Sequence, residues 1–327
     1  MSAQASSMAQ QAGGALGRVG AILSKPIPLG QLFSIPIELH ASFFIVLGLQ
    51  LLTSIPQGGW AVLLWSIVLG PMLLGTVLLH ELGHCLAARQ VGAHVAGILL
   101  WPLGGLAFIG QTPSPKADAW VAIAGPLTHI PQVLVWLLLL LPAYHADTGS
   151  WALKLYVPYP SAAHFLHALF ACGVIINISL FAFNLLVPAY PLDGGRLLVD
   201  GLLWAGVAPR RTAWTTIGVA VPLGLGVLVY GFYPHFQMVT ILVAGFILFA
   251  TYQLYQALRA DALARHPLFA AVYNSGGAAG GGGGASGGAA GGHEGPYFKF
   301  ESVVVDSAGG GVSAGGAAGA QQQQQPH

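Results

Sequence analysis

Long stretches without charge constrain the fold of this chain more than any other feature of its sequence. Between residues 60 and 79 no side chain carries a formal charge, and several other apolar runs approach the roughly 20 residues that a helix needs to cross a bilayer. Charged residues make up 6% of the sequence, against about 25% in ordinary soluble domains. The sequence therefore predicts an all-α polytopic membrane protein embedded in a lipid bilayer.

About six of the apolar runs are predicted to be transmembrane helices. They cover residues 39–55, 60–88, 119–141, 165–187, 212–233 and 238–258. The stretch after the second of them, residues 94–111, is also apolar, but Pro102, Gly104 and Gly105 disfavour a helix there. Backbone without helical hydrogen bonds is tolerated at membrane depth only where protein or water covers it. We therefore expect a short re-entrant or β-hairpin segment after the second helix.

Composition divides the chain into three parts. Residues 1–36, rich in Ala, Ser, Gly and Gln, are predicted to be a flexible N-terminal segment. Residues 37–258 form the predicted membrane-embedded domain. Residues 259–327 contain a long Gly/Ala-rich stretch and five consecutive glutamines, which cannot bury enough apolar surface to fold. We expect this last part to be a disordered tail.

The basic residues predict the orientation in the membrane. Six crossings place both termini on one side, and ten of the eleven Lys and Arg residues fall on that side, with only Lys154 on the other. This bias indicates that the termini face the cytosol, or the stroma or matrix of an organelle. The same residues form no basic patch, which argues against a nucleic-acid partner. The sequence identifies no regulatory partner.

The second predicted helix ends in the sequence His80-Glu81-Leu82-Gly83-His84. Histidines four residues apart share one face of a helix, where both can bind zinc with the glutamate beside the ion. Alone, this short pattern also fits two ordinary surface histidines on a soluble helix. In a membrane helix, however, ionisable groups are costly unless they serve a site. The motif therefore indicates a metal site at the inner end of this helix.

Asp193 is the expected third ligand. The second and fourth predicted helices both run inward, so the histidines and Asp193 emerge at the same side of the membrane. Zinc held by three protein ligands with an open fourth position is the catalytic arrangement, and we expect one zinc ion per chain. Asp200, seven residues further on, is a rival ligand, and Asp193 could also be an ordinary turn aspartate before glycine.

These residues belong to a wider pattern. The His-Glu-x-x-His motif is followed by Pro102-Leu103-Gly104-Gly105-Leu106-Ala107, by Ala124-Gly125-Pro126-Leu127 and by residues 184–195. Over residues 35–258 the chain resembles the site-2 protease family of intramembrane zinc metalloproteases, peptidase family M50, in its compact six-span type. The resemblance implies three zinc ligands, a catalytic acid/base, a residue that positions substrate or stabilises the oxyanion, and an edge strand near Gly104 for an unwound substrate. The implied zinc ligands are His80, His84 and Asp193. The implied acid/base is Glu81, and the implied positioning or oxyanion residue is Asn184.

Two positions depart from the family pattern. Asn184 lies one residue further from Pro188 than the family spacing has it. His129 stands where the family often has Asn after its Gly-Pro pair, and we interpret it as structural or cavity-lining rather than as a fourth ligand. His40 and His94 could approach the inner face, but we interpret them as structural too.

The predicted function is hydrolysis of peptide bonds in membrane-embedded protein substrates near the inner face, by zinc-activated water with Glu81 as general base. A polytopic metal-ion transporter or channel with the same polar cluster is the alternative, because polar residues and broken helices also mark ion pathways. A serine or aspartyl intramembrane protease lacks its motif in this sequence. An inactive membrane scaffold is disfavoured because the expected ligands and base are all present.

Overall fold

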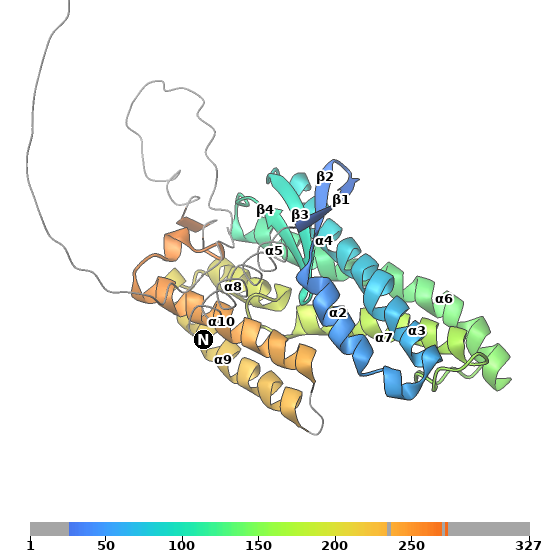
Figure 1. The fold of residues 1–327 in the computed structure, drawn as a ribbon. Coiled ribbons are helices and arrows are strands. Elements are labelled where there is room, and N and C mark those ends of the chain that lie inside the picture. Colours follow the sequence, from blue (N-terminus) through green and yellow to red (C-terminus); the bar gives the residue numbers. More distant parts are fainter. Residues whose placement is uncertain (1–25, 234–236, 270–271, 274–327) are drawn as a thin grey trace, which may run out of the picture. The chain divides into compact units, whose positions relative to one another are not determined.

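The computed structural model describes residues 26–233, 237–269 and 272–273, and helices predominate among them (Figure 1). The helices are α2 (Ser42–Leu52), α3 (Gly59–Ile67), α4 (Leu73–Gln90), α5 (Pro115–Leu127), α6 (His129–Thr148), α7 (Phe165–Leu186), α8 (Asp193–Trp204), α9 (Pro209–Phe232) and α10 (Met238–Arg259). A π-helical turn at Val68–Met72 joins α3 to α4, and short 3-10 turns lie at Ile55–Gln57 and Leu263–Arg265.

Among the described residues, five helical segments are long and apolar enough to cross a membrane. They are Gly59–Gln90, Pro115–Thr148, Phe165–Leu186, Pro209–Phe232 and Met238–Arg259. Large apolar side chains remain exposed on them, such as Leu138 at 71% and Val229 at 66%. Helices that are apolar all round suit a lipid environment. The prediction of a mostly helical, multi-pass membrane protein is therefore confirmed.

The predicted count of six spans is not confirmed. Residues 35–40, at the start of the first predicted span, form a strand, and α2 after it has 11 residues. A helix of that length rises about 16 Å, roughly half of the hydrocarbon core. The first long segment, Gly59–Gln90, is kinked where Gly70 leaves helical geometry before Pro71, whose ring cannot donate a backbone hydrogen bond.

A four-stranded sheet is the main departure from the all-α prediction. The strands are β1 (Pro26–Leu32), β2 (Ile35–His40), β3 (Val95–Trp101) and β4 (Gly104–Ile109), in that order across the sheet. The outer pairs are antiparallel and β2 pairs with β3 in parallel. Apolar side chains alternate along β2, so that Ile35, Ile37 and Leu39 are buried. They pack with residues of β3, α2 and α4 in one core.

The residues expected to form a hairpin or re-entrant segment, 94–111, contain β3 and β4. These strands pair antiparallel, with Trp101 opposite Gly104 at the turn. They follow the first candidate span rather than the second, because the chain before α3 does not supply a full crossing. The hairpin lies against α4, the helix that carries both motif histidines.

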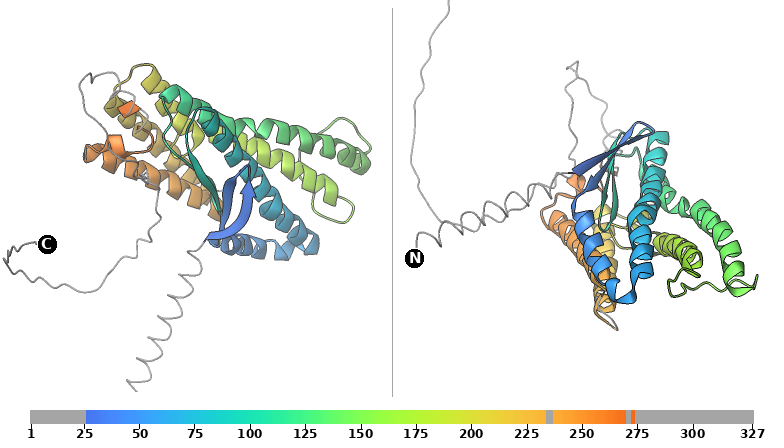
Figure 2. Two further views of the ribbon diagram at one scale, coloured as in Figure 1. Left: turned by 90° about the horizontal axis from the view of Figure 1, so that it is seen from above. Right: turned by 45° about the vertical axis from the view of Figure 1, so that its right-hand side comes forward.

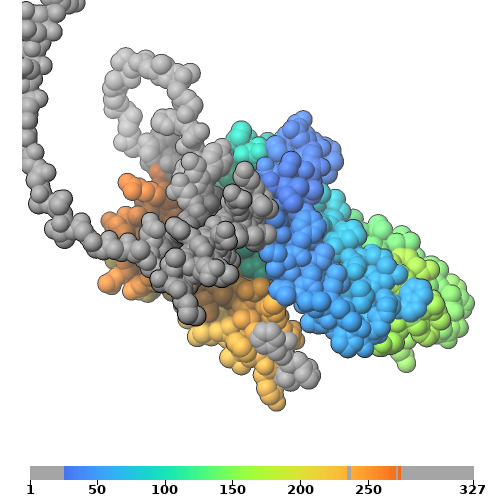
Figure 3. Space-filling model, in the orientation of Figure 1, coloured from blue at the N-terminus to red at the C-terminus, as the bar shows by residue number. Residues whose placement is uncertain are grey.

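Ordered structure extends beyond the predicted limits of the membrane domain. The sequence predicts residues 1–36 to be flexible, but β1 lies within them. It is ordered because it pairs with β2. After α10, Leu263, Leu268 and Phe269 pack against α9 and α10, and Phe269 is fully buried. Residues 1–25 and 274–327, which include most of the predicted tail, lie outside the described residues. The space-filling view shows the blue N-terminal elements on one face (Figure 3).

Helix pairs determine which segments meet. α6 packs along α7 and α9 along α10, as all three ribbon views show (Figures 1 and 2). α5 packs against both α4 and α8. Because α4 carries the histidine motif and α8 begins at Asp193, their common neighbour α5 brings the two ends of the predicted site together.

Candidate metal centre

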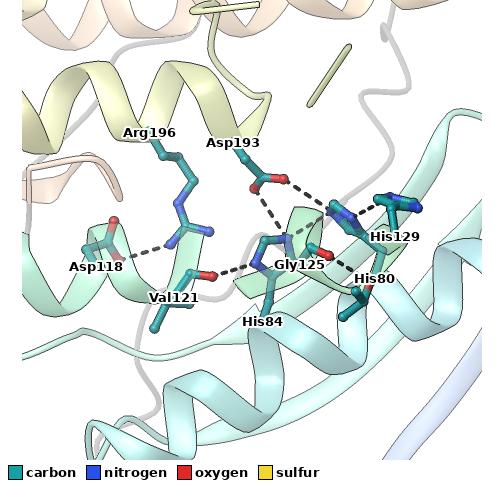
Figure 4. A network of polar contacts seen from close by, with 9 residues as sticks. His80, His84, Asp118, Val121, Gly125, His129, Asp193 and Arg196 are labelled. Carbon is teal, nitrogen blue, oxygen red and sulfur yellow. Dashed lines mark hydrogen bonds and ion pairs between the residues drawn. The ribbon is translucent and has the colours of Figure 1, made fainter. Parts of the chain in front are cut away.

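His80, Glu81 and His84 lie in the middle of α4, and all three are buried. The spacing of four residues turns both imidazoles toward α5 and the start of α8, as expected for positions i and i+4 of a helix (Figure 4). Asp193 is the first residue of α8, and its carboxylate is also buried. The chain reaches it through the irregular residues 187–192 that follow α7.

Three ligand atoms of His80, His84 and Asp193 lie within 4.8 Å of one another. The Nε2 atoms of the two histidines are 3.0 Å apart. His80 Nε2 lies 3.2 Å from Asp193 Oδ2, and His84 Nε2 lies 3.3 Å from Asp193 Oδ1 (Figure 4). The structure therefore brings together the three residues that the sequence proposed as zinc ligands.

The hydrogen bonds of these groups leave unprotonated ligand atoms directed at a point where a cation can bind. His84 Nδ1 lies 2.7 Å from the Val121 carbonyl, which can only accept, so Nδ1 carries the proton and a neutral His84 has its lone pair on Nε2. Asp193 Oδ2 is buried and accepts no hydrogen bond from the described residues. A nitrogen lone pair and a carboxylate that face one enclosed point would repel each other without a positive charge between them. Imidazole nitrogen and carboxylate oxygen are donors that zinc accepts.

Two glycines let neighbouring elements approach the motif closely. A Cβ atom at Gly125 of α5 would lie 2.2 Å from His84 Nε2, and one at Gly105 of β4 would lie 2.3 Å from Glu81 Cγ. Both distances are shorter than any real contact, so neither position accepts a side chain without displacing its neighbour. Glu81 is thus held against the backbone of β4, directly beside the two histidines.

His129 lies next to the cluster, outside the group of three ligand residues. It is 1% exposed, and its Nε2 is 3.1 Å from His80 Nδ1. Its Nδ1 is 2.9 Å from Oδ1 of Asn177, which is fully buried in α7. Sequence reasoning missed Asn177, although an amide at the centre of a predicted transmembrane helix is a signal of a functional polar contact.

Asn184 and the other candidates lie outside the three-ligand group. Asn184 is half-buried in the last turn of α7, and its side chain makes no hydrogen bond with a described residue. His40 contacts Ser42 at 2.6 Å, and His94 precedes β3. Asp200, the rival ligand, is buried on α8 but is absent from the metal-ligand group found among the described residues.

An ion pair ties α8 to α5 beside the centre. Arg196 donates from Nη2 to Asp118 Oδ1 at 3.0 Å (Figure 4). Thr112 donates to the same oxygen at 3.2 Å. Asp200 lies in the same surroundings, and burial, together with the charge of Asp118, raises its pKa to about 8. Arg196 is three residues after Asp193, so the ion pair fixes the turn of α8 that presents the third ligand.

Several known proteins are similar to this chain in sequence. The model of peptidase family M50 matches residues 69–229, which include both histidines and Asp193. Rip3 of Mycobacterium tuberculosis is 34% identical over 222 residues, which cover 63% of this chain and 52% of Rip3. The zinc metalloprotease MJ0392 of Methanocaldococcus jannaschii is 30% identical over 227 residues, which cover 69% of this chain and 60% of that protein. The chain thus spans between half and two thirds of the length of these relatives.

A solved structure, that of a site-2 protease from Methanocaldococcus jannaschii, also matches. It is 28% identical in sequence, with a TM-score of 0.49, and the match covers 70% of this chain and 94% of that one.

Proposed function

This chain belongs to peptidase family M50, the site-2 protease family of zinc metalloproteases, and from that premise we propose that it is an intramembrane zinc metalloendopeptidase. Its substrates are membrane-embedded proteins, cleaved near the inner face of the membrane. The observation that carries this proposal is the convergence of His80, His84 and Asp193 beside Glu81 on apolar helices.

Each residue of the centre has a role. His80, His84 and Asp193 would hold one zinc ion. The bound ion would supply Lewis-acid chemistry, since it would lower the pKa of a water molecule to about 7 and polarise the peptide carbonyl. Glu81 is the general base that takes a proton from the attacking water and returns it to the leaving amine. Its contact with the backbone at Gly105 keeps the carboxylate beside the two ligands.

The substrate binds in an extended form along β4. β4 is the last strand in the sheet order, so one of its edges is paired with β3 and the other faces no described strand. A transmembrane helix has its carbonyls in internal hydrogen bonds, and it must unwind locally before a carbonyl can react. Pairing with an open strand edge replaces those hydrogen bonds. Asn184, at the end of α7, contributes to substrate positioning rather than to metal binding.

The membrane-embedded protease domain comprises residues 37–258, with β1 and the buried residues after α10 packed onto it. The positive-inside bias supports an active site that opens toward the cytosol, or toward the stroma or matrix of an organelle.

The test is zinc content and cleavage of a transmembrane peptide substrate in detergent. We expect the wild type to hold about one zinc ion and to cleave. Glu81→Gln should keep the metal and lose about 10²- to 10⁴-fold in rate, the usual contribution of a general base. Asp193→Ala should lose the metal.

Glu38→Gln on β2 is the matched control, since Glu38 is a half-buried acid that belongs to no metal-ligand group among the described residues. It should behave as wild type. If the wild type carries metal ions across liposome membranes and cleaves no substrate, the protease proposal is wrong and the chain is a metal-ion transporter.

A further inference from the structure

A chain of buried hydrogen bonds leads from the backbone of α7 to the metal centre. Asn177 donates from Nδ2 to the Gly173 carbonyl at 2.9 Å, and its Oδ1 faces His129 Nδ1 at 2.9 Å. His129 Nε2 in turn faces His80 Nδ1 at 3.1 Å. His129 and Asn177 are 1% and 0% exposed, so water cannot substitute for a missing partner.

The direction of every hydrogen bond follows from the first one. The Gly173 carbonyl can only accept, so the amide nitrogen of Asn177 must face it and the amide oxygen must face His129. His129 Nδ1 therefore carries a proton, and neutral His129 has its lone pair on Nε2. That lone pair accepts from His80 Nδ1, which leaves the lone pair of His80 on Nε2, the atom 3.2 Å from Asp193 Oδ2.

The opposite direction is excluded by the same geometry. If His129 donated to His80, its Nδ1 would need a donor from Asn177. The rotated amide would then set its oxygen against the Gly173 carbonyl, where two acceptors would meet without a proton. His80 would also carry its proton on Nε2, directed at the point where the ligand atoms converge.

We propose that His129 and Asn177 are positioning residues that hold His80 in the tautomer and orientation in which its Nε2 can bind zinc. His84 has the same constraint in a simpler form, because its Nδ1 donates directly to the Val121 carbonyl. Partners of this kind on the second ring nitrogen raise metal affinity and fix the ring. The proposal rests on the zinc site of the proposed function, and it adds residues from α6 and α7 to that site.

Zinc affinity in the full chain, measured by competition with a chelator in detergent, tests the proposal. His129→Leu should weaken binding by about 10- to 100-fold, the usual cost of losing such a partner. Asn177→Leu should weaken it in the same direction but less. Because Asn177 acts through His129, the double variant should be no weaker than His129→Leu alone. His129→Gln, whose amide can accept from His80 and donate to Asn177, should restore most of the affinity.

Thr251→Val is the matched control. Thr251 is also buried in a membrane helix and donates to the carbonyl four residues earlier, Ile247, at 2.7 Å, but it lies on α10. It should leave zinc affinity unchanged. Unchanged affinity in Asn177→Leu, or losses that add in the double variant, would overturn the proposal.

The tautomer can be read in the wild type, and a variant is needed only to assign the signals. In metal-free protein labelled with ¹⁵N histidine, His80 should show a protonated Nδ1 and an unprotonated Nε2, with its signals assigned from their loss in His80→Gln. The reverse pattern would refute the hydrogen-bond chain even if the variants failed to fold. A wild type that binds no zinc at all would instead refute the proposed function, whatever the tautomer.

Discussion

Two groups of two histidines and one aspartate occupy different parts of this molecule, and only one of them has the geometry of a metal site. The first contains His80, His84 and Asp193, and the second contains His164, His167 and Asp147. α6 links them, because its first residue, His129, contacts the first group and Asp147 lies near its other end. Asp147 is 18 positions after His129, which corresponds to about 27 Å along the helix.

The difference lies in the ring nitrogen that faces the carboxylate. In the first group the Nδ1 atoms have other partners, so both Nε2 atoms converge on Asp193. In the second, Nδ1 of each histidine contacts its own oxygen of Asp147, at 2.6 Å for His167. The second group satisfies its carboxylate with two donors and needs no cation. Residue types alone therefore do not define a metal site. What defines it here is that Nδ1 of each histidine has a partner of its own, so that Nε2 stays free for a metal.

Exchanging each aspartate for asparagine gives the largest contrast between the two groups. Asp193→Asn should weaken zinc binding by more than about 100-fold, because loss of an outer partner alone costs 10- to 100-fold. Asp147→Asn should leave zinc affinity unchanged. It should instead lower the free energy of unfolding by about 1–3 kcal/mol, since an amide has one acceptor oxygen for two histidine donors.

Chelator competition and chemical unfolding, both in detergent, measure the two effects. Weaker zinc binding in Asp147→Asn would show that the second group is coupled to the centre. An unchanged zinc affinity in Asp193→Asn would remove this residue from the ligand set.

The two glycines of the centre separate metal binding from catalysis. Gly125→Ala places a methyl group on the His84 imidazole, so zinc affinity should fall by about tenfold or more. Gly105→Ala presses on Glu81 instead, so zinc content should stay while cleavage falls by about 10²-fold, the effect of a displacement near 1 Å. Gly226→Ala on α9 is the control, because its added methyl would meet no atom within 4 Å. Equal losses of zinc in both variants would mean that Glu81 and His84 move together.

The site was more predictable from the sequence than the fold around it. Helical spacing places His80 and His84 on one face whatever the surroundings. The predicted common direction of their helix and of the helix before Asp193 was enough to bring in Asp193. The orientation of His80 was not predictable, because it depends on Asn177, 97 positions further along the chain. No local pattern reports a contact between α4, α6 and α7.

The sheet could have been predicted in part. Ile35, Ile37 and Leu39 alternate with Pro36, Glu38 and His40, which is the signature of a strand with one buried face. A hydropathy window of helix length merges this short strand with the apolar residues of α2 and so yields a sixth span. The parallel pairing of β2 with β3 was beyond prediction, since it joins segments on either side of a long membrane helix.

The smallest expected effect concerns the two aspartates of α8. Asp200 was the rival ligand, and its Oδ2 is buried without a hydrogen-bond partner among the described residues. Because burial and Asp118 raise its pKa from 3.8 to about 8, the folded protein binds more protons at this position than the unfolded chain between about pH 4 and pH 8. Its contribution to stability is therefore greatest below pH 4 and is lost as the pH rises through 8.

Asp200→Asn should remove this dependence. We expect the free energy of unfolding to rise at pH 8.5, where the folded protein must bury an ionised carboxylate, with no rise at pH 4 and an unchanged zinc affinity. Asp261→Asn, at a side chain 94% exposed, should change neither quantity. The free energies of unfolding of the wild type, Asp200→Asn and Asp261→Asn, measured at pH 4 and pH 8.5, test this prediction. A loss of zinc in Asp200→Asn would mean that α8 supplies two ligands, and the contrast between a carboxylate that binds the metal and one that does not would fail.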